Sequence, residues 1–367
     1  MPTEYVIPWA KPEFWGDEQR YVVDALSSQW ISGGPFVDRL EAEFARLNGT
    51  THAVATSNGT TALHLAYLAV GIQPGDEIIV PGFAFMAAAN IALHLRAVPI
   101  FADVDPKSWL ITGAEIERRL SPRTRAIVPV HTYGNVCAMD DIMALAAKRE
   151  IPVIEDAAEA FASSYRGAFA GTLGALGTYS FHATKTITTG EGGMVVTRSD
   201  YLKERMHLYR SHGMSNVRYW HDVAGHNFRL TNIQAALGCA QLAHVDKISA
   251  ARIRMLANYR RHLDNVDGLV TQHFGPDVEA VPWAVAVKLD PRAFPQGRDE
   301  VMREMQAAGI ETRPGFYTPT TMKHLYRSEQ LPVSDDVSAS VVVLPSFCSL
   351  SEQQIETICS RLKRMRR

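Results

Sequence analysis

Residues 180–194 read SFHATKTITTGEGGM, and this stretch is the most informative motif for the fold and function of the chain. Lys185 is followed by small and hydroxyl side chains and then by the glycine-rich run Gly190–Gly193. Such a lysine can approach a flat aldehyde cofactor without steric conflict, and its amine can form a Schiff base. The other interpretation of the same string is a surface lysine beside a glycine turn. The surrounding sequence therefore has to decide between the two.

Outward from this stretch, short apolar runs alternate with helical segments from about residue 51 to about residue 200. We expect buried strands at His52–Thr56, Glu77–Val80, Val98–Phe101, Ala126–Val130 and Pro152–Glu155. We expect helices at Thr60–Val70, Met86–Leu95, Ala114–Leu120 and Met139–Arg149. Alternation of this kind is typical of an α/β protein with a mostly parallel sheet covered on both faces.

The pattern changes in the last third of the chain. Thr231–Leu263 is strongly helical and can connect to a second domain. A strand-like segment at Ala280–Leu289, a helix near Asp299–Ala308 and a final helix near Glu352–Arg364 indicate a smaller α+β domain. We therefore expect a large domain over residues 1–250 and a small C-terminal domain over residues 251–367.

Composition excludes several classes of function. The chain has 367 residues and a net charge of −2, so it lacks the concentrated basic charge of a nucleic-acid-binding protein. Its four cysteines are widely spaced without a CxxC pair, which predicts free thiols in a reducing cytoplasm and neither disulfides nor a metal site. We see no signal peptide and no apolar run long enough to cross a bilayer, so we expect a cytoplasmic protein without a membrane partner.

A second motif follows the first expected strand, where residues 54–63 read VATSNGTTAL. Ser-Asn-Gly-Thr here joins a strand to a helix and leaves backbone N–H groups and a hydroxyl facing outward. A helix N-terminus with free N–H groups is a natural phosphate site. An ordinary helix start with Asn or Ser as N-cap explains the same residues.

A third motif is VIEDAAE at residues 153–159. Two acids follow a buried strand at once, and ligands of open α/β sheets bind at such strand ends. A carboxylate at that position can pair with a protonated pyridine nitrogen and keep the ring electron-accepting. Alternatively, Asp156 is only the N-cap of the next helix. Together, a phosphate cradle, a strand-end acid and a downstream lysine are the parts that a pyridoxal 5′-phosphate enzyme needs.

Nearly the full length of the chain resembles the DegT/DnrJ/StrS family of sugar aminotransferases. The matching strings are SNGTTALHLA (57–66), PGDEIIVPGFAF (74–85), PVHTYG (129–134), IEDAAEA (154–160), SFHATKTITTGEGGM (180–194), RYWHDVAGHNFRLTNIQAALG (218–238) and GIETRP (309–314). The resemblance implies the type I, aspartate aminotransferase-like fold, with a large domain built on a mostly parallel sheet and a smaller C-terminal α+β domain. It also implies a homodimer with shared active sites.

The resemblance also implies roles for single residues. Lys185 would form the Schiff base with pyridoxal phosphate and carry the proton between cofactor and substrate carbon. Asp156 would pair with the pyridine nitrogen. The other cofactor-binding residues would be Gly59, Thr60 and Ser180 at the phosphate, Phe85 on the ring face, Asn227 reaching the phosphate from the partner subunit, and Glu159 near cofactor and sugar. From the residues alone, core packing is the favoured explanation of Phe85.

Because the chain keeps Lys185, where dehydratase relatives carry histidine, it should transaminate. The resemblance implies L-glutamate as amino donor, with 2-oxoglutarate as its product, and C4 of a nucleotide-linked 4-keto-6-deoxyhexose as acceptor. The strings at 185–194, 218–222, 225–232 and 309–314 resemble the branch that makes GDP-perosamine from GDP-4-keto-6-deoxymannose. His182-Ala183-Thr184 instead resembles enzymes acting on dTDP-4-keto-6-deoxyglucose. Gly315 and the segment 316–321 also depart from the perosamine branch.

Six residues are candidates for substrate binding: Trp30, Ser32, His182, Arg313, Phe316 and Tyr317. Each also has a structural explanation. His182 can be a packed histidine, Arg313 can belong to a structural ion pair, and the loop at Trp30 can be a plain helix-to-helix turn. Two other functions stay open: amination of a cyclitol or another keto-sugar, and a regulatory protein that reuses the fold.

Overall fold

A computed structural model describes residues 6–215, 217–325 and 329–367. Its central sheet has the strand order β3–β2–β4–β5–β8–β9–β1, because isolated parallel bridges at Ile127–Val153 and Val130–Asp156 join two smaller sheets at β4 and β5. The strands are β1 (His52–Thr56), β2 (Glu77–Pro81), β3 (Val98–Ala102), β4 (Thr124–Ile127), β5 (Ile154–Asp156), β8 (Leu176–Ser180) and β9 (Gly193–Thr197). The strand β9 runs opposite to the other six and pairs antiparallel with β8 and β1, so the expectation of a mostly parallel sheet is confirmed.

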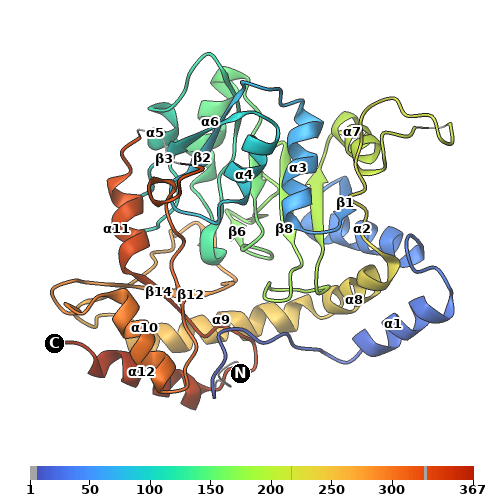
Figure 1. Ribbon diagram of the computed structural model, residues 1–367. Helices are drawn as coiled ribbons and strands as arrows, with labels where there is room; N and C mark the ends of the chain where they lie inside the picture. The colour runs from blue at the N-terminus through green and yellow to red at the C-terminus, as the bar shows by residue number, and fades with distance from the viewer. Residues whose placement is uncertain (1–5, 216, 326–328) are drawn as a thin grey trace.

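Side chains on successive positions of each central strand enter two different cores, as the period-2 geometry of a strand requires. In β2, Ile79 joins one buried cluster, while Ile78 and Val80 join the other. The first cluster lies against α2 (Pro35–Asn48), α5 (Gly113–Glu117), α6 (Met139–Arg149) and α8 (Asn232–Leu242). The second lies against α3 (Gly59–Val70), α4 (Ala87–His94) and α7 (Asp200–Arg210). Both faces of the sheet are therefore covered (Figure 1).

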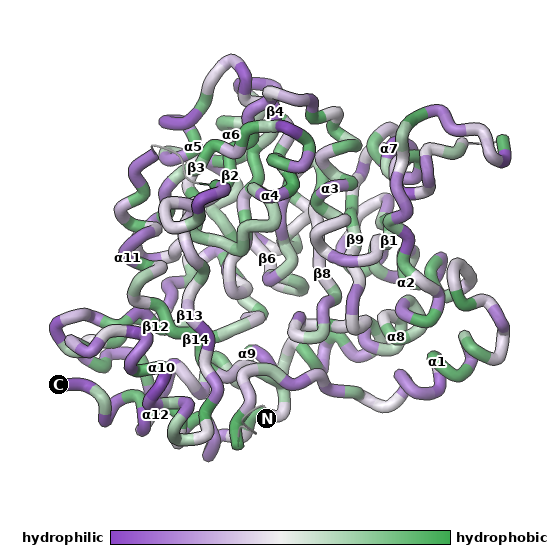
Figure 2. The backbone as a smooth tube through the Cα atoms, in the orientation of Figure 1, coloured by the Kyte–Doolittle hydropathy of each residue, from purple (hydrophilic) through white to green (hydrophobic). Residues whose placement is uncertain are grey.

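The C-terminal part forms a separate antiparallel sheet of order β10–β12–β14–β13. Its strands are β10 (Leu269–Thr271), β12 (Val285–Leu289), β13 (Arg313–Pro314) and β14 (Val341–Leu344). They pack with α9 (Val245–Leu263), α10 (Arg298–Ala307), α11 (Pro332–Ser340) and α12 (Glu352–Arg364). Figure 2 shows apolar residues concentrated in the interior strands and hydrophilic residues along the outer helices α10 and α12.

Several expected boundaries were wrong. The expected helix Thr231–Leu263 is two helices, α8 and α9, which separate at Ala243 and His244. The expected strand Ala280–Leu289 begins only at Val285, because Pro282 cannot donate to a sheet ladder. The division of the chain at residue 250 falls inside α9 and stays a prediction.

The remaining elements are α1 (Glu18–Ser27), the short 3₁₀ turns Thr132–Gly134 and Pro319–Thr321, and a small three-stranded sheet. That sheet consists of β6 (Ser164–Tyr165), β7 (Ala168–Phe169) and β11 (Val278–Glu279). Across the described ranges, no helix has the length and apolar character that crossing a membrane requires.

Candidate active site

Lys185 lies in the loop between β8 and β9, beyond the carboxyl end of β8. Its Nζ is 3.5 Å from Oε1 of Glu159 and 3.7 Å from the centroid of the Trp283 ring, and its side chain is only 13% exposed. Burial lowers the pKa of Lys185, while the charges of Glu159 and Asp156 oppose that shift. A lysine whose charged form is disfavoured by burial is a stronger nucleophile at neutral pH. The surface-lysine interpretation is therefore wrong.

Asp156 ends β5 and is almost fully buried. Its backbone is fixed on both sides, since its N–H donates to Pro129 O and its carbonyl accepts from the N–H of His131. Its Oδ1 accepts a hydrogen bond from the N–H of Ala158 at 3.1 Å. Burial raises the pKa of Asp156, and the nearby Lys185 acts in the opposite direction. Few groups around this buried carboxyl stabilise its charged form, so it is well suited to bind a cationic nitrogen.

The first turn of α3 forms a cradle beside the end of β8. Asn58 caps the helix, with its side chain accepting from the N–H of Thr61 at 2.9 Å. Gly59 lies so close to Ser180 that a Cβ on Gly59 would be 2.7 Å from the Ser180 Cβ. Three residues singled out from the sequence, Gly59, Thr60 and Ser180, therefore meet at the positive end of a twelve-residue helix.

This close approach gives a prediction for Gly59. We expect Gly59→Ala to destabilise the protein by roughly 1–3 kcal/mol, because the new methyl group has no room against Ser180. Adding Ser180→Gly removes the opposing Cβ and should recover part of the loss. Denaturant unfolding of both apoproteins measures the effect. If the double variant is no more stable than Gly59→Ala alone, the contact does not explain the glycine.

Glu159 connects Lys185 to a residue that the sequence analysis did not single out. Its Oε2 accepts from the N–H of Tyr133 at 2.9 Å, while its Oε1 faces Lys185. Tyr133 has a left-handed backbone with φ of 64°, which is unusual for a bulky side chain. Its ring is stacked on Phe316 at 5.3 Å. Tyr133 lay inside the string PVHTYG, but nothing local distinguished it from a core aromatic.

An aromatic cleft of about 440 Å³ adjoins Lys185, because Trp283 contacts the lysine and also lines the cleft. Its lining includes Phe85, Arg313, Phe316 and Tyr317, four residues that the sequence analysis had selected. Phe85 is 61% exposed and contacts Phe316 edge-on at 6.0 Å, so core packing does not explain it. Arg313 does form the structural ion pair, with Glu311 at 2.5 Å, yet its side chain is 55% exposed.

Other selected residues lie outside this cluster in the single chain. Trp30 and Ser32 adjoin α8, where their carbonyls accept hydrogen bonds from Asn232. The exposed Asn227 accepts from Arg229 Nε at 3.0 Å. Its neighbour Phe228 does approach the cradle, since its carbonyl accepts from the N–H of Ser57 at 2.8 Å. His182 is exposed, with Nδ1 3.1 Å from the Thr184 hydroxyl, so it is not a packed histidine.

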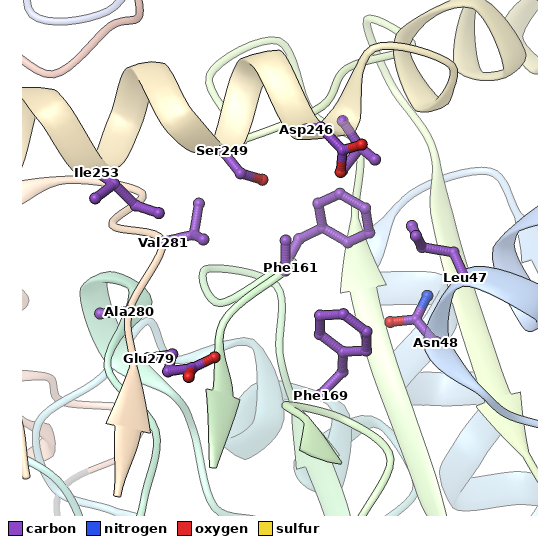
Figure 3. Close-up of a pocket in the computed structure, with 12 residues that line it drawn as sticks. Leu47, Asn48, Phe161, Phe169, Asp246, Ser249, Ile253, Glu279, Ala280 and Val281 are labelled. Atoms are coloured by element: carbon purple, nitrogen blue, oxygen red, sulfur yellow. The ribbon is translucent and has the colours of Figure 1, made fainter. Parts of the chain in front are cut away.

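A second cavity of about 470 Å³ lies between α9 and the segment that carries Phe161 and Phe169 (Figure 3). Figure 3 shows these two rings and Ile253 bordering the space, with Asp246 and Glu279 near it. None of the residues selected from the sequence lines this cavity. Within the described residues, no cluster of three or more His, Cys, Asp or Glu side chains is arranged to hold a metal ion.

Comparison with known proteins agrees with this geometry. The sequence profile of the DegT/DnrJ/EryC1/StrS aminotransferase family matches residues 13–363. Two relatives named GDP-perosamine synthase are each 41% identical: that of Caulobacter vibrioides, covering 96% of both chains, and that of Escherichia coli O157:H7, covering 97% of both. The crystal structure of the aminotransferase TlmJ from Streptoalloteichus hindustanus superposes with a TM-score of 0.92 at 29% identity, covering 98% of both chains.

A type I fold with a buried lysine and a buried acid at neighbouring strand ends defines a pyridoxal phosphate-dependent aminotransferase. The chain belongs to the DegT/DnrJ/EryC1/StrS aminotransferase family.

Proposed function

We propose that this enzyme converts GDP-4-keto-6-deoxymannose to GDP-perosamine, with L-glutamate as amino donor and 2-oxoglutarate as by-product. The observation that carries the proposal is the Lys185 amine, which lies beside Glu159 and against Trp283, a residue that lines the aromatic cleft. The 41% identity to two GDP-perosamine synthases over almost the whole chain supports this choice of sugar nucleotide.

The residues present fit pyridoxal phosphate. The N–H groups of Gly59 and Thr60 and the hydroxyl of Ser180 would bind its phosphate, in a cradle that a Cβ on Gly59 would fill. Asp156 would pair with the pyridine nitrogen, Phe85 would cover the ring face, and Lys185 would bond to the aldehyde carbon. We also assign Glu159 to this site. We assign Asn227 to the phosphate of the cofactor bound in the partner subunit. When bound, the cofactor supplies an electron-accepting ring for the bonds being broken at the amino-bearing carbon.

Lys185 would carry the proton in both halves of the reaction. Its Nζ takes the α-proton from glutamate and later delivers a proton to C4 of the sugar. Burial lowers the pKa of the amine, which favours its neutral form, and Glu159 limits where the amine can lie. The buried Asp156 carboxylate would hold a proton on the facing ring nitrogen, because an ion pair in this desolvated site is strong.

The aromatic cleft would accept part of the sugar nucleotide. Phe316 and Tyr317 offer ring faces for stacking, and a guanidinium has five N–H donors, so the ion pair of Arg313 leaves donors for a phosphate. We assign His182, Trp30 and Ser32 to the substrate as well, the latter two across a dimer interface.

We also propose a homodimer. Large apolar side chains are exposed on α1 and the loop after it, and on the excursion between α7 and α8. Burying them against a second chain would be favourable. They are Val23, Leu26, Trp30, Ile31, Val217, Tyr219 and Trp220. Figure 1 shows the excursion projecting from the body of the chain. Light scattering should give the mass of two chains. Trp220→Ser combined with Tyr219→Ser should weaken the association, and a wild-type monomer at working concentration would contradict the proposal.

The nucleotide is tested by competition. We expect the enzyme to aminate GDP-4-keto-6-deoxymannose with a kcat/KM at least roughly tenfold above that for dTDP-4-keto-6-deoxyglucose, since a lost base contact costs about 1–3 kcal/mol. The two products differ in mass and can be read from one mixture. The reverse preference would follow His182-Ala183-Thr184 and assign the enzyme to dTDP sugars. Activity on a cyclitol alone would overturn both.

A further inference from the structure

Trp283 is a second group, besides Glu159, that contacts the Lys185 amine. The Nζ of Lys185 lies 3.7 Å from the centroid of the indole, which is the geometry of a cation–π contact. The contact to Glu159 is 3.5 Å, at the outer limit of a hydrogen bond. A lysine side chain has four rotatable bonds, so one long hydrogen bond alone would leave the amine poorly placed.

The indole is itself fixed from several directions. Its Nε1 donates to the carbonyl of Thr184 at 2.8 Å, one residue before the lysine. Its backbone N–H donates to the carbonyl of Tyr133. The rings of Trp9 and Tyr133 contact it, edge-on at 5.5 Å and stacked at 6.3 Å. With 7% of its surface exposed, Trp283 cannot move without disturbing these neighbours.

Arg252 on α9 ties the two backbones together. Its guanidinium donates to the carbonyls of Pro282 and Trp283, at 3.2 and 2.9 Å, and to that of Lys185 at 3.4 Å. Arg252 is 5% exposed, and a buried guanidinium without a carboxylate hydrogen-bonded to it in the described residues is costly to maintain. The arrangement therefore fixes the segment before β12 against the loop that carries the reactive lysine.

We propose that Trp283, held in place by Arg252, is a positioning residue that fixes the Lys185 amine for its reaction. The proposal rests on Lys185 being the cofactor lysine, as proposed above. Neither residue carries a proton in the reaction. Their role is to limit where the amine can lie, in contact with an indole face and with a carboxylate.

The test measures the Lys185 amine in the apoprotein, without cofactor or substrate. Competitive acetylation with acetic anhydride, read by mass spectrometry of the Lys185 peptide across pH, gives the midpoint at which the amine becomes reactive. Glu159, Asp156 and Arg252 are the charged groups that face this amine, and they stay unchanged in Trp283 variants. The indole favours the charged amine, so we expect the midpoint to fall by roughly half to one pH unit in Trp283→Leu.

Trp283→Phe keeps a smaller aromatic face and loses only the Nε1 hydrogen bond, so its midpoint should lie between wild type and Trp283→Leu. The rate of transamination should fall in the same order, by roughly tenfold in Trp283→Leu. Trp109→Leu is the matched control, because Trp109 is a fully buried indole of the same aromatic cluster. It should lower the melting temperature without moving the midpoint.

A Trp283→Leu protein with the wild-type midpoint would overturn the proposal, and so would an equal shift in Trp109→Leu. These outcomes are independent of the sugar substrate. If Lys185 were not the cofactor lysine, the midpoints could still follow the expected order, while Lys185→Arg would keep full activity.

Discussion

Lys185→Arg is expected to reduce amino-sugar formation by roughly 10⁴-fold while the protein stays folded. Arginine keeps a positive charge beside Glu159, but its guanidinium does not lose a proton at any working pH. It can therefore neither bond to an aldehyde nor carry a proton. Initial rates with saturating keto-sugar and glutamate measure the loss.

The same variant has a spectroscopic signature. Wild-type protein incubated with pyridoxal phosphate should be yellow, and borohydride should remove the absorbance band and fix the cofactor mass on the Lys185 peptide. The variant should show neither change. Lys288→Arg is the matched control, because Lys288, on β12, is paired with Asp336 of α11 and takes no part in the site. Lys185→Arg protein that forms amino sugar at the wild-type rate would refute the assignment.

Asp156→Asn is expected to stabilise the apoprotein and to abolish most of its activity. Burial raises the pKa of Asp156, so the folded chain keeps its proton to a higher pH than the unfolded chain does. As pH rises above the ordinary carboxyl pKa, the cost of ionising this buried group reduces the stability of the fold. Asparagine has no such cost, and the melting temperature of the apoprotein should rise by roughly 2–4 °C at neutral pH.

The activity of this variant should fall by roughly 10²-fold or more, since a neutral amide cannot hold a proton on the facing ring nitrogen. Calorimetry of the apoprotein and initial rates of the reconstituted enzyme measure the two effects separately. A variant with lower apoprotein stability and normal turnover would show that Asp156 is a structural residue.

The adjacent acid, Glu155, supplies a control for which the expected change in stability has the opposite sign. Glu155 accepts hydrogen bonds from the N–H groups of Gly171, Leu173 and Gly174, and it pairs with the ring of His131 at 2.9 Å. Glu155→Gln replaces one carboxylate oxygen by an NH₂ group, which cannot accept hydrogen bonds from these backbone N–H groups. We expect this to destabilise the protein by about 2–4 kcal/mol. Two neighbouring carboxylates are therefore expected to respond to the same substitution in opposite directions.

Local sequence predicted five of the seven strands of the central sheet; β8 and β9 were not among them. The apolar runs at β1 and β2 are short and β-branched, which predicted buried strands, and parallel strands bring their carboxyl ends to one edge. This is why Gly59, Asp156 and Lys185 were expected near one cofactor, whereas the place of Ser180 beside Gly59 came from the family resemblance.

Features made by contacts between distant segments were not predictable in the same way. The contact of Trp283 with Lys185 arises only when the C-terminal part folds onto the sheet. The contact of Tyr133 with Glu159 joins the segments that follow β4 and β5. Arg252 occupies a position of α9 that a helical pattern cannot mark as buried. The separation of α8 from α9 at Ala243 and His244 also lacks a glycine or proline to indicate it.

The most direct test of the account is transfer of the amino group itself. Purified enzyme is loaded with pyridoxal phosphate and incubated with GDP-4-keto-6-deoxymannose and ¹⁵N-labelled L-glutamate, and the sugar nucleotide is analysed by mass spectrometry and NMR. We predict one ¹⁵N atom on C4 of the sugar, one 2-oxoglutarate per amino sugar, and no product from Lys185→Arg. Unlabelled sugar after exhaustive incubation, or label on a carbon other than C4, would contradict the account.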